Sequence, residues 1–173
     1  MIIRLILNEA KNIGFLYHFT TIPSLINILL SNKLESPISL TRNKNFNKVT
    51  SIIPTEARIT LDGSLLSNNY KISPFNYGYR KKWVSDKGKT EFKNIWDPEF
   101  EDQSEEVINK DIINLKKYIK EINVNEIDMW DYLDEDYIHH LDQLSYYLGK
   151  KTEDLSYDDI ERFLLKNKVV IKR

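Results

Sequence analysis

The stretch Phe15-Leu16-Tyr17-His18-Phe19-Thr20, followed by residues 21 to 30, decides the fold. Aromatic and apolar residues dominate its first part, which predicts a β-strand that carries a polar His18. The second part repeats apolar residues at the i, i+3, i+4, i+7 spacing of a helix, with Thr20-Thr21 as its cap and Pro23 tolerated in the first turn. We therefore expect a strand that leads directly into an amphipathic helix.

Further elements follow from the same patterns. Residues 38 to 41 and 57 to 61 alternate as strands do, and the second of these ends in Asp62-Gly63, which predicts a turn. Residues 104 to 124 are ambiguous by periodicity: their apolar residues fit one helical face, and they also fit a strand, a short helix near Leu115 and a strand, which the family resemblance given below favours. Three more elements are expected towards the C-terminus: a helix from Ile138 to Leu148 stopped by Gly149, a helix opened by a Ser156/Asp159 capping box, and a strand at 169 to 171.

The composition is that of one soluble domain. The chain has 173 residues, and its net charge of -1 gives no bulk attraction to nucleic acid or to an acidic membrane. It has no cysteine, which excludes a disulfide scaffold, a thiolate zinc site and a Cys nucleophile. No apolar run has the length of a membrane span, so we expect a cytoplasmic protein. The scarcity of Ala beside abundant Ile, Asn and Lys indicates AT-rich coding DNA, as in a low-GC bacterium or its phage.

The sequence lacks the motifs of several common catalytic and metal sites. The adjacent His139 and His140 do not converge as metal ligands at i, i+4 would, and the Asp residues near 131 lack the glycine of a calcium loop. No Walker lysine, GxGxxG or GxSxG motif occurs. We therefore expect no metal cofactor.

Three separated segments carry the remaining candidate chemistry: Tyr17 to Thr20, Ser39 to Arg42, and Gln103 to Ile108, which contains Glu105 and Glu106. In their order and spacing they resemble the diphtheria-toxin-like ADP-ribosyltransferases, and within these the DarT-type DNA ADP-ribosyltransferases. The similarity covers residues 15 to 125: a YH-x-T motif with its helix, an arginine at Arg42, and a strand-borne glutamate before an I-x-x-I-x-V strand. Ser24 stands where the family commonly has Asn.

The resemblance implies an α+β fold, with a split antiparallel sheet and peripheral helices around a cleft for NAD, the co-substrate. We expect a single domain, in which the resemblance covers a core at 15–125 and a mainly helical extension at 126–173 lies outside it. It implies mono-ADP-ribosyl transfer to a macromolecule, nucleic acid before protein, in a toxin–antitoxin or phage setting, by a monomer or weak oligomer. The implied catalytic residues are Glu106 and Arg42, and the implied NAD-binding residues are His18, Thr20, Ser24, Thr41, Arg42 and Phe46.

These residue types suit that chemistry. Cleavage of the nicotinamide–ribose bond passes through an oxocarbenium-like cation, which a fixed carboxylate stabilises. Neighbours on a strand face opposite sides, so only one of Glu105 and Glu106 can enter the cleft. The planar fork of Arg42 pairs with two diphosphate oxygens, and a neutral His18 can both donate and accept a hydrogen bond.

The acceptor is expected to contact the segment before Glu106, as the resemblance implies. Residues 78 to 93 hold six Lys or Arg and two acids, and aromatic residues are interleaved with them. Basic side chains can follow a phosphate backbone while aromatic ones stack on bases. The candidate acceptor-binding residues are Arg80, Lys81, Lys82 and Trp83.

Two alternatives remain open. One is a non-catalytic phage or bacterial interaction module on the same fold, whose acidic block at 121–142 would mimic nucleic acid or bind a basic partner. The other is a phosphotransferase acting on RNA, which would need more cations in the cleft than Arg42.

Overall fold

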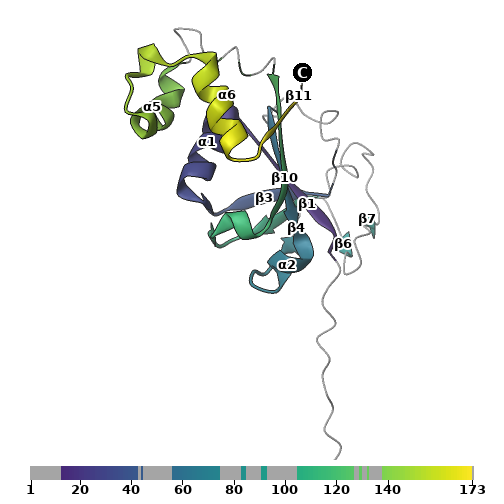
Figure 1. The fold of residues 1–173 in the computed structure, drawn as a ribbon. Coiled ribbons are helices and arrows are strands. Elements are labelled where there is room, and N and C mark those ends of the chain that lie inside the picture. The colour runs from purple at the N-terminus through teal and green to yellow at the C-terminus, as the bar shows by residue number, and fades with distance from the viewer. Residues whose placement is uncertain are drawn as a thin grey trace, which may run out of the picture.

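The computed structural model describes residues 13–42, 44, 56–74, 83–84, 91–92, 105–126, 129, 132 and 138–172, the side chains of strand residues 73–74, 83–84, 91–92 and 105–106 excepted. Over these ranges the chain is a mixed α+β structure (Figure 1). The strands are β1 (Phe15–Thr20), β2 (Lys33–Leu34), β3 (Ile38–Thr41), β4 (Ala57–Asp62), β5 (Ser73–Pro74), β6 (Trp83–Val84), β7 (Glu91–Phe92), β8 (Glu105–Ile108), β9 (Ile112–Ile113), β10 (Ile119–Asn125) and β11 (Val170–Lys172). The α-helices are α1 (Ile22–Ser31), α2 (Gly63–Ser67), α5 (Asp142–Leu148) and α6 (Tyr157–Lys166), and the 3-10 turns are η2 (Leu115–Lys117), η4 (Ile138–Leu141) and η5 (Thr152–Asp154).

Seven of the described strands form one sheet in the order β11-β10-β4-β1-β3-β8-β5. All of its neighbouring pairs are antiparallel except β10 and β11, which run parallel. We expected a split sheet. The strands instead form one continuous hydrogen-bonded sheet, in which the junction between β1 and β3 is weak. Strand β1 registers with β4 over its whole length, from Phe15 to Thr20, but with β3 only at Tyr17 and Thr41.

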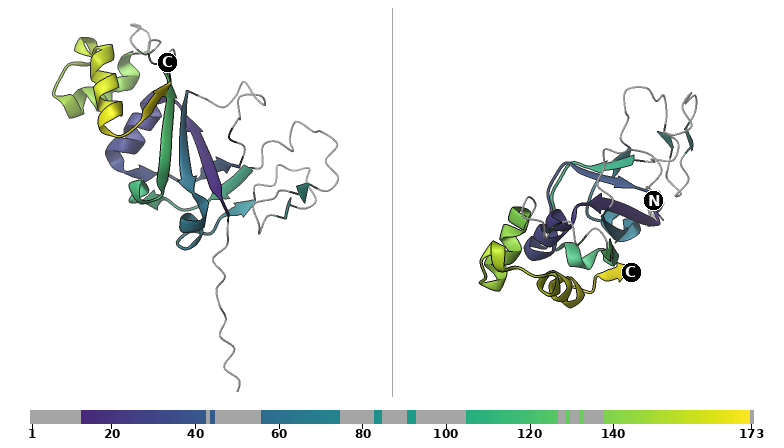
Figure 2. Two further views of the ribbon diagram at one scale, coloured as in Figure 1. Left: turned by 45° about the vertical axis from the view of Figure 1, so that its right-hand side comes forward. Right: turned by 90° about the horizontal axis from the view of Figure 1, so that it is seen from above.

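The core lies between the helices and one face of the sheet. On β1 and β4, Leu16 and Leu61 are register partners and are fully buried. Helix α1 places Ile22, Leu25, Ile26 and Leu29 in the same core, as its apolar spacing predicted. Figures 1 and 2 show α1, α5 and α6 on one side of the sheet, with β6 and β7 on the other side of the molecule.

Most local predictions are confirmed. The side chain of Thr21 caps α1, and Ser156 and Asp159 form the expected capping box of α6. Gly149 ends α5 in the left-handed conformation, with φ 66°. The helix expected from Ile138 begins as the 3-10 turn η4 and becomes α-helical at Asp142.

The prediction of a turn at Asp62-Gly63 is wrong. The side chain of Asp62 accepts a hydrogen bond from the Leu65 amide at 2.9 Å, and so caps helix α2. The Gly63 amide donates to the Gly14 carbonyl at 2.8 Å, and a Cβ at Gly63 would lie 2.6 Å from that oxygen. The glycine therefore serves a close backbone approach and not a reversal of the chain.

None of the helices within the described ranges is long and apolar enough to cross a membrane.

Candidate functional site

The weak junction between β1 and β3 holds the side chain of His18. Next to the Tyr17–Thr41 pair, His18 Nδ1 lies 3.0 Å from the backbone oxygen of Ser39 on β3. Since a carbonyl can only accept, Nδ1 carries the proton and donates it. The imidazole thus hydrogen-bonds to the backbone of β3 at a point where β1 and β3 are no longer paired in register.

Burial, more than this contact, sets the charge state of His18. Burial lowers the pKa of the imidazole below its usual 6.5, and the hydrogen bond to Ser39 opposes this only in part. The ring is half-buried by accessible surface, but the surrounding protein atoms displace enough water for desolvation to dominate. At neutral pH His18 is therefore uncharged, with a protonated Nδ1 and an acceptor at Nε2.

His18 lines a pocket of about 710 Å³ beside α1. This volume is within the range of roughly 300 to 1,000 Å³ that is usual for small-molecule sites. The lining residues are His18, Thr20, Ser24, Asn27, Ile28, Leu30, Ser31, Lys33, Leu34, Glu35 and Gln143. We call this the His18 pocket.

Three of the expected NAD-binding residues, His18, Thr20 and Ser24, meet in this pocket. They are close because β1 passes into α1 through Thr21, whose hydroxyl accepts from the Ser24 amide at 3.2 Å. The same hydroxyl donates to Ser24 Oγ at 2.9 Å, so the Ser24 hydroxyl keeps its own proton for a further acceptor. The cap of α1 thus also orients a pocket side chain.

His18 follows Tyr17 and Arg42 follows Thr41. Because β1 and β3 are antiparallel, the two residues lie on opposite sides of the Tyr17–Thr41 pair along the strands. Its guanidinium donates to the backbone oxygen of Ile13 at 3.2 Å, and Arg42 is not among the residues that line the His18 pocket. Thr41 is buried opposite Tyr17 and does not line that pocket either. Phe46 lies outside the described residues.

The two candidate glutamates lie on β8, the other neighbour of β3. In the register, Glu106 is opposite Leu40 and Glu105 is opposite Thr41. The strands that carry His18 and Glu106 therefore lie on either side of β3, although 88 residues separate them in the sequence. Only the backbone of Glu105 and Glu106 is described.

Of the expected acceptor segment, the structure describes only the backbone of two short strands. Trp83 in β6 pairs with Phe92 in β7. Arg80, Lys81 and Lys82 lie outside the described residues.

Sequence reasoning missed several residues of the His18 pocket. Asn27 and Ser31 follow Ser24 at i+3 and i+7, which makes a polar stripe along an otherwise apolar helix. This stripe was visible in the sequence and could have identified both residues. Gln143 comes from α5, and no local pattern connects it with β1.

Two carboxylates bind the start of α1 and the segment that follows the helix. At the start, Glu56 Oε2 accepts from the Ile22 amide at 2.9 Å and from the Tyr132 hydroxyl at 2.8 Å. After the helix, Asp111 accepts from the Ser36 amide at 2.8 Å and pairs with Lys33 at 2.9 Å. These bonds lower the pKa of Asp111 to about 2 and raise that of Lys33. The charge of Lys33, at the pocket wall, is thus already compensated.

The chain matches no family model, no curated protein and no solved structure. In the part of the chain that the structure describes, no three His, Asp or Glu side chains gather as metal ligands would.

Proposed function

We propose that the protein is an NAD-dependent mono-ADP-ribosyltransferase whose dinucleotide site is the His18 pocket. One observation carries this proposal: a neutral histidine at the junction of β1 and β3 lines a ligand-sized pocket beside α1, and β3 has the glutamate-bearing β8 as its other neighbour.

The pocket offers hydrogen bonds rather than charge, which suits the ribose and carboxamide groups of NAD. His18 Nε2 can accept from a hydroxyl or an amide, and Ser24 can donate. Asn27 and Ser31 add two more polar side chains along α1. Directional contacts of this kind hold the ribose in a fixed orientation, which lowers the entropic part of the barrier.

In the proposed reaction the bond between ribose C1′ and the nicotinamide nitrogen breaks, and nicotinamide leaves with the electron pair. A nucleophile of the acceptor forms a bond to C1′ and loses its proton. Glu106 supplies the carboxylate that stabilises the cationic transition state. The acceptor is a macromolecule, nucleic acid before protein, because the basic residues 78 to 93 precede this glutamate in the sequence.

The test combines NAD⁺ calorimetry with an assay of nicotinamide release. We expect the wild-type chain to bind NAD⁺ and release nicotinamide, His18→Ala to weaken binding, and Glu106→Gln to bind normally but lose turnover. Glu105→Gln is the matched control, since it removes the same charge one residue away. No binding heat with the wild-type chain would contradict the proposal and favour a non-catalytic interaction module. Normal turnover in Glu106→Gln with loss in Glu105→Gln would exchange their roles.

The role of Arg42 is decided by the same assays. If Arg42 binds the NAD diphosphate, Arg42→Gln weakens NAD⁺ binding as strongly as His18→Ala does. If its main partner is the Ile13 carbonyl, the same variant lowers the unfolding midpoint and leaves the affinity of the folded chain unchanged.

A further inference from the structure

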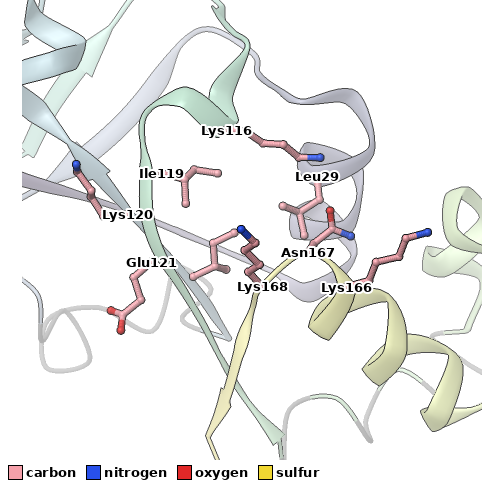
Figure 3. Close-up of a pocket in the computed structure, with 9 residues that line it drawn as sticks. Leu29, Lys116, Ile119, Lys120, Glu121, Lys166, Asn167 and Lys168 are labelled. Atoms are coloured by element: carbon pink, nitrogen blue, oxygen red, sulfur yellow. The ribbon is translucent and has the colours of Figure 1, made fainter.

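A second pocket, of about 330 Å³, lies between β10 and the turn from α6 to β11 (Figure 3). Four of its nine lining residues are lysines, and none is an arginine. The lining residues are Leu29, Lys116, Ile119, Lys120, Glu121, Ile122, Lys166, Asn167 and Lys168. We call this the lysine pocket.

The floor of the lysine pocket is apolar. Leu29 comes from α1, and Ile119 and Ile122 come from β10. Leu29 and Ile122 belong to the core and expose only 4% and 2% of their surface. The pocket is therefore a rigid, aliphatic surface surrounded by flexible cationic side chains.

The charged groups around this floor are not balanced. Lys120 is paired with Asp62 at 3.0 Å, and the carboxylate of Glu121 is paired with Arg58 at 3.4 Å. Within the described ranges, Lys116, Lys166 and Lys168 form no ion pair. Figure 3 shows Glu121 pointing away from Lys116 and Lys168. An anion in the pocket would thus meet uncompensated positive charge.

The two central lysines come from different parts of the chain. Lys116 belongs to η2, and Lys168 follows α6, so their ammonium groups approach the floor from separate elements (Figure 3). Lys166 is at the rim, and its ammonium group lies 3.4 Å from the Tyr147 hydroxyl. A ligand that satisfies both central lysines needs negative charge on more than one side of an apolar group.

Lys168 adds a second observation. Its backbone is in the left-handed region, with φ 61°, where a glycine would carry no steric cost. The stability of the α6–β11 turn therefore does not account for a lysine at this position. A side chain that contacts a ligand would account for it.

We propose that the lysine pocket binds single-stranded nucleic acid, with one base on the aliphatic floor and the flanking phosphates on Lys116 and Lys168. A strand alternates phosphate, base and phosphate, which matches cations on both sides of an apolar floor. An acidic peptide fits less well, because a run of carboxylates supplies no apolar group for the aliphatic floor between the two lysines.

The lysine pocket and the His18 pocket share α1 as a wall, since Leu29 lines one while Ile28 and Leu30 line the other. A helix with its side chains is about 10 to 12 Å thick, so a bound strand would lie near the other pocket. The proposal goes beyond the proposed transferase activity and does not depend on it, because its test measures binding without NAD⁺.

The test is the fluorescence anisotropy of a labelled oligothymidylate, about twelve nucleotides long, measured at several salt concentrations. We expect Lys116→Gln/Lys168→Gln to weaken binding by about tenfold or more at low salt and to reduce the log–log salt slope by about 1.4, or about 0.7 for each phosphate that is no longer neutralised. The matched control is Lys71→Gln/Lys110→Gln, which removes the same charge from exposed positions outside the pocket. Its binding should change by less than about twofold.

A single variant separates binding from folding. Lys168→Gly removes the ammonium group and relieves the left-handed backbone, so the thermal midpoint should not fall while binding of the oligonucleotide weakens. Unchanged binding in Lys168→Gly would overturn the proposal. It would also be overturned if the control pair weakened binding as much as the pocket pair, or if polyglutamate or thymidine monophosphate bound as tightly as the oligonucleotide and with the same dependence on the two lysines. If Lys168→Gly weakens oligonucleotide binding by the same factor in the His18→Ala chain as in the wild-type chain, the two pockets act separately.

Discussion

The two pockets beside α1 differ in the kind of recognition they offer. The His18 pocket is lined by polar and mostly neutral groups, its histidine is uncharged at neutral pH, and its one lysine is paired with Asp111. The lysine pocket has an aliphatic floor and three lysines that form no ion pair among the described residues. Directed hydrogen bonds depend on protonation state, whereas exposed charges depend on ionic strength. The first pocket should therefore respond to pH and the second to salt.

The largest expected effect comes from the helix that the two pockets share. Leu25 is fully buried in α1 and lines neither pocket. Leu25→Ala should lower the free energy of unfolding by about 2 to 5 kcal/mol and weaken both ligand interactions together, which urea denaturation and the two binding assays would measure. Asn27→Ala, on the exposed side of the same helix, should change stability by less than about 0.5 kcal/mol. Equal decreases in stability in both variants would show that α1 is not held by its apolar face.

The next effect should be confined to the first turn of α6, at the end of the helix far from the lysine pocket. Ser156 caps α6, and Ser156→Ala should cost about 1 kcal/mol and increase hydrogen exchange in the first turn of that helix. The partner carboxyl, Asp159, has a pKa of about 2 because Lys150 and Ser156 hydrogen-bond to it. Its folded-state pKa is below the unfolded value of 3.8, so its contribution is complete above pH 3.8 and is lost as the pH falls through about 2. Amides of α1 should keep their exchange rates in Ser156→Ala, and equal acceleration there would contradict a local effect.

Whether the sequence predicts an element depends on how far apart in the sequence the residues that form its contacts are. Elements β1, α1 and α6 follow from patterns within a few residues, such as the Thr21 cap and the Ser156/Asp159 box, and they are confirmed. The parallel pairing of β10 with β11 and the one-residue register of β1 with β3 are tertiary contacts that no local pattern encodes. Asp62-Gly63 illustrates the limit, since its turn-like dipeptide serves a helix cap and a close contact with Gly14.

The same distinction applies to the sites. His18, Thr20 and Ser24 were predicted together and share a pocket because a single strand-to-helix connection carries them. Arg42 directly follows the next strand of the sheet, β3, whose antiparallel direction takes it away from His18. Lys116 and Lys168 are 52 residues apart, and each alone has the sequence context of an ordinary surface charge. They reach one floor only in the folded chain, where η2 and the turn after α6 line the same pocket.

A smaller effect distinguishes the His18 pocket by its pH response. The folded-state pKa of His18 is below the unfolded value of 6.5, so the unfolded chain binds more protons between these values. The stability that His18 contributes is therefore complete above about pH 7.5 and is lost as the pH falls below 6.5 and through the folded-state pKa. Thermal midpoints of the wild-type chain should fall between about pH 7.5 and pH 5, and His18→Gln should lack this part of the fall. Parallel curves for the two chains would mean that another group titrates.

The smallest effect tests whether a lysine of the lysine pocket contributes to oligonucleotide binding when a carboxylate already pairs with it. Lys120 lines the lysine pocket as Lys116 does, but Asp62 already neutralises it at 3.0 Å, and Figure 3 shows it on the other side of β10 from Lys116 and Lys168. Lys120→Gln should therefore weaken oligonucleotide binding by less than about twofold, whereas Lys116→Gln alone should weaken it about threefold or more. Stability should fall by no more than about 0.5 kcal/mol in Lys120→Gln, as for other exposed ion pairs. If the two single variants weakened binding equally, the lysines would act as a diffuse positive field, and the distinction between a built pocket and a charged surface would fail.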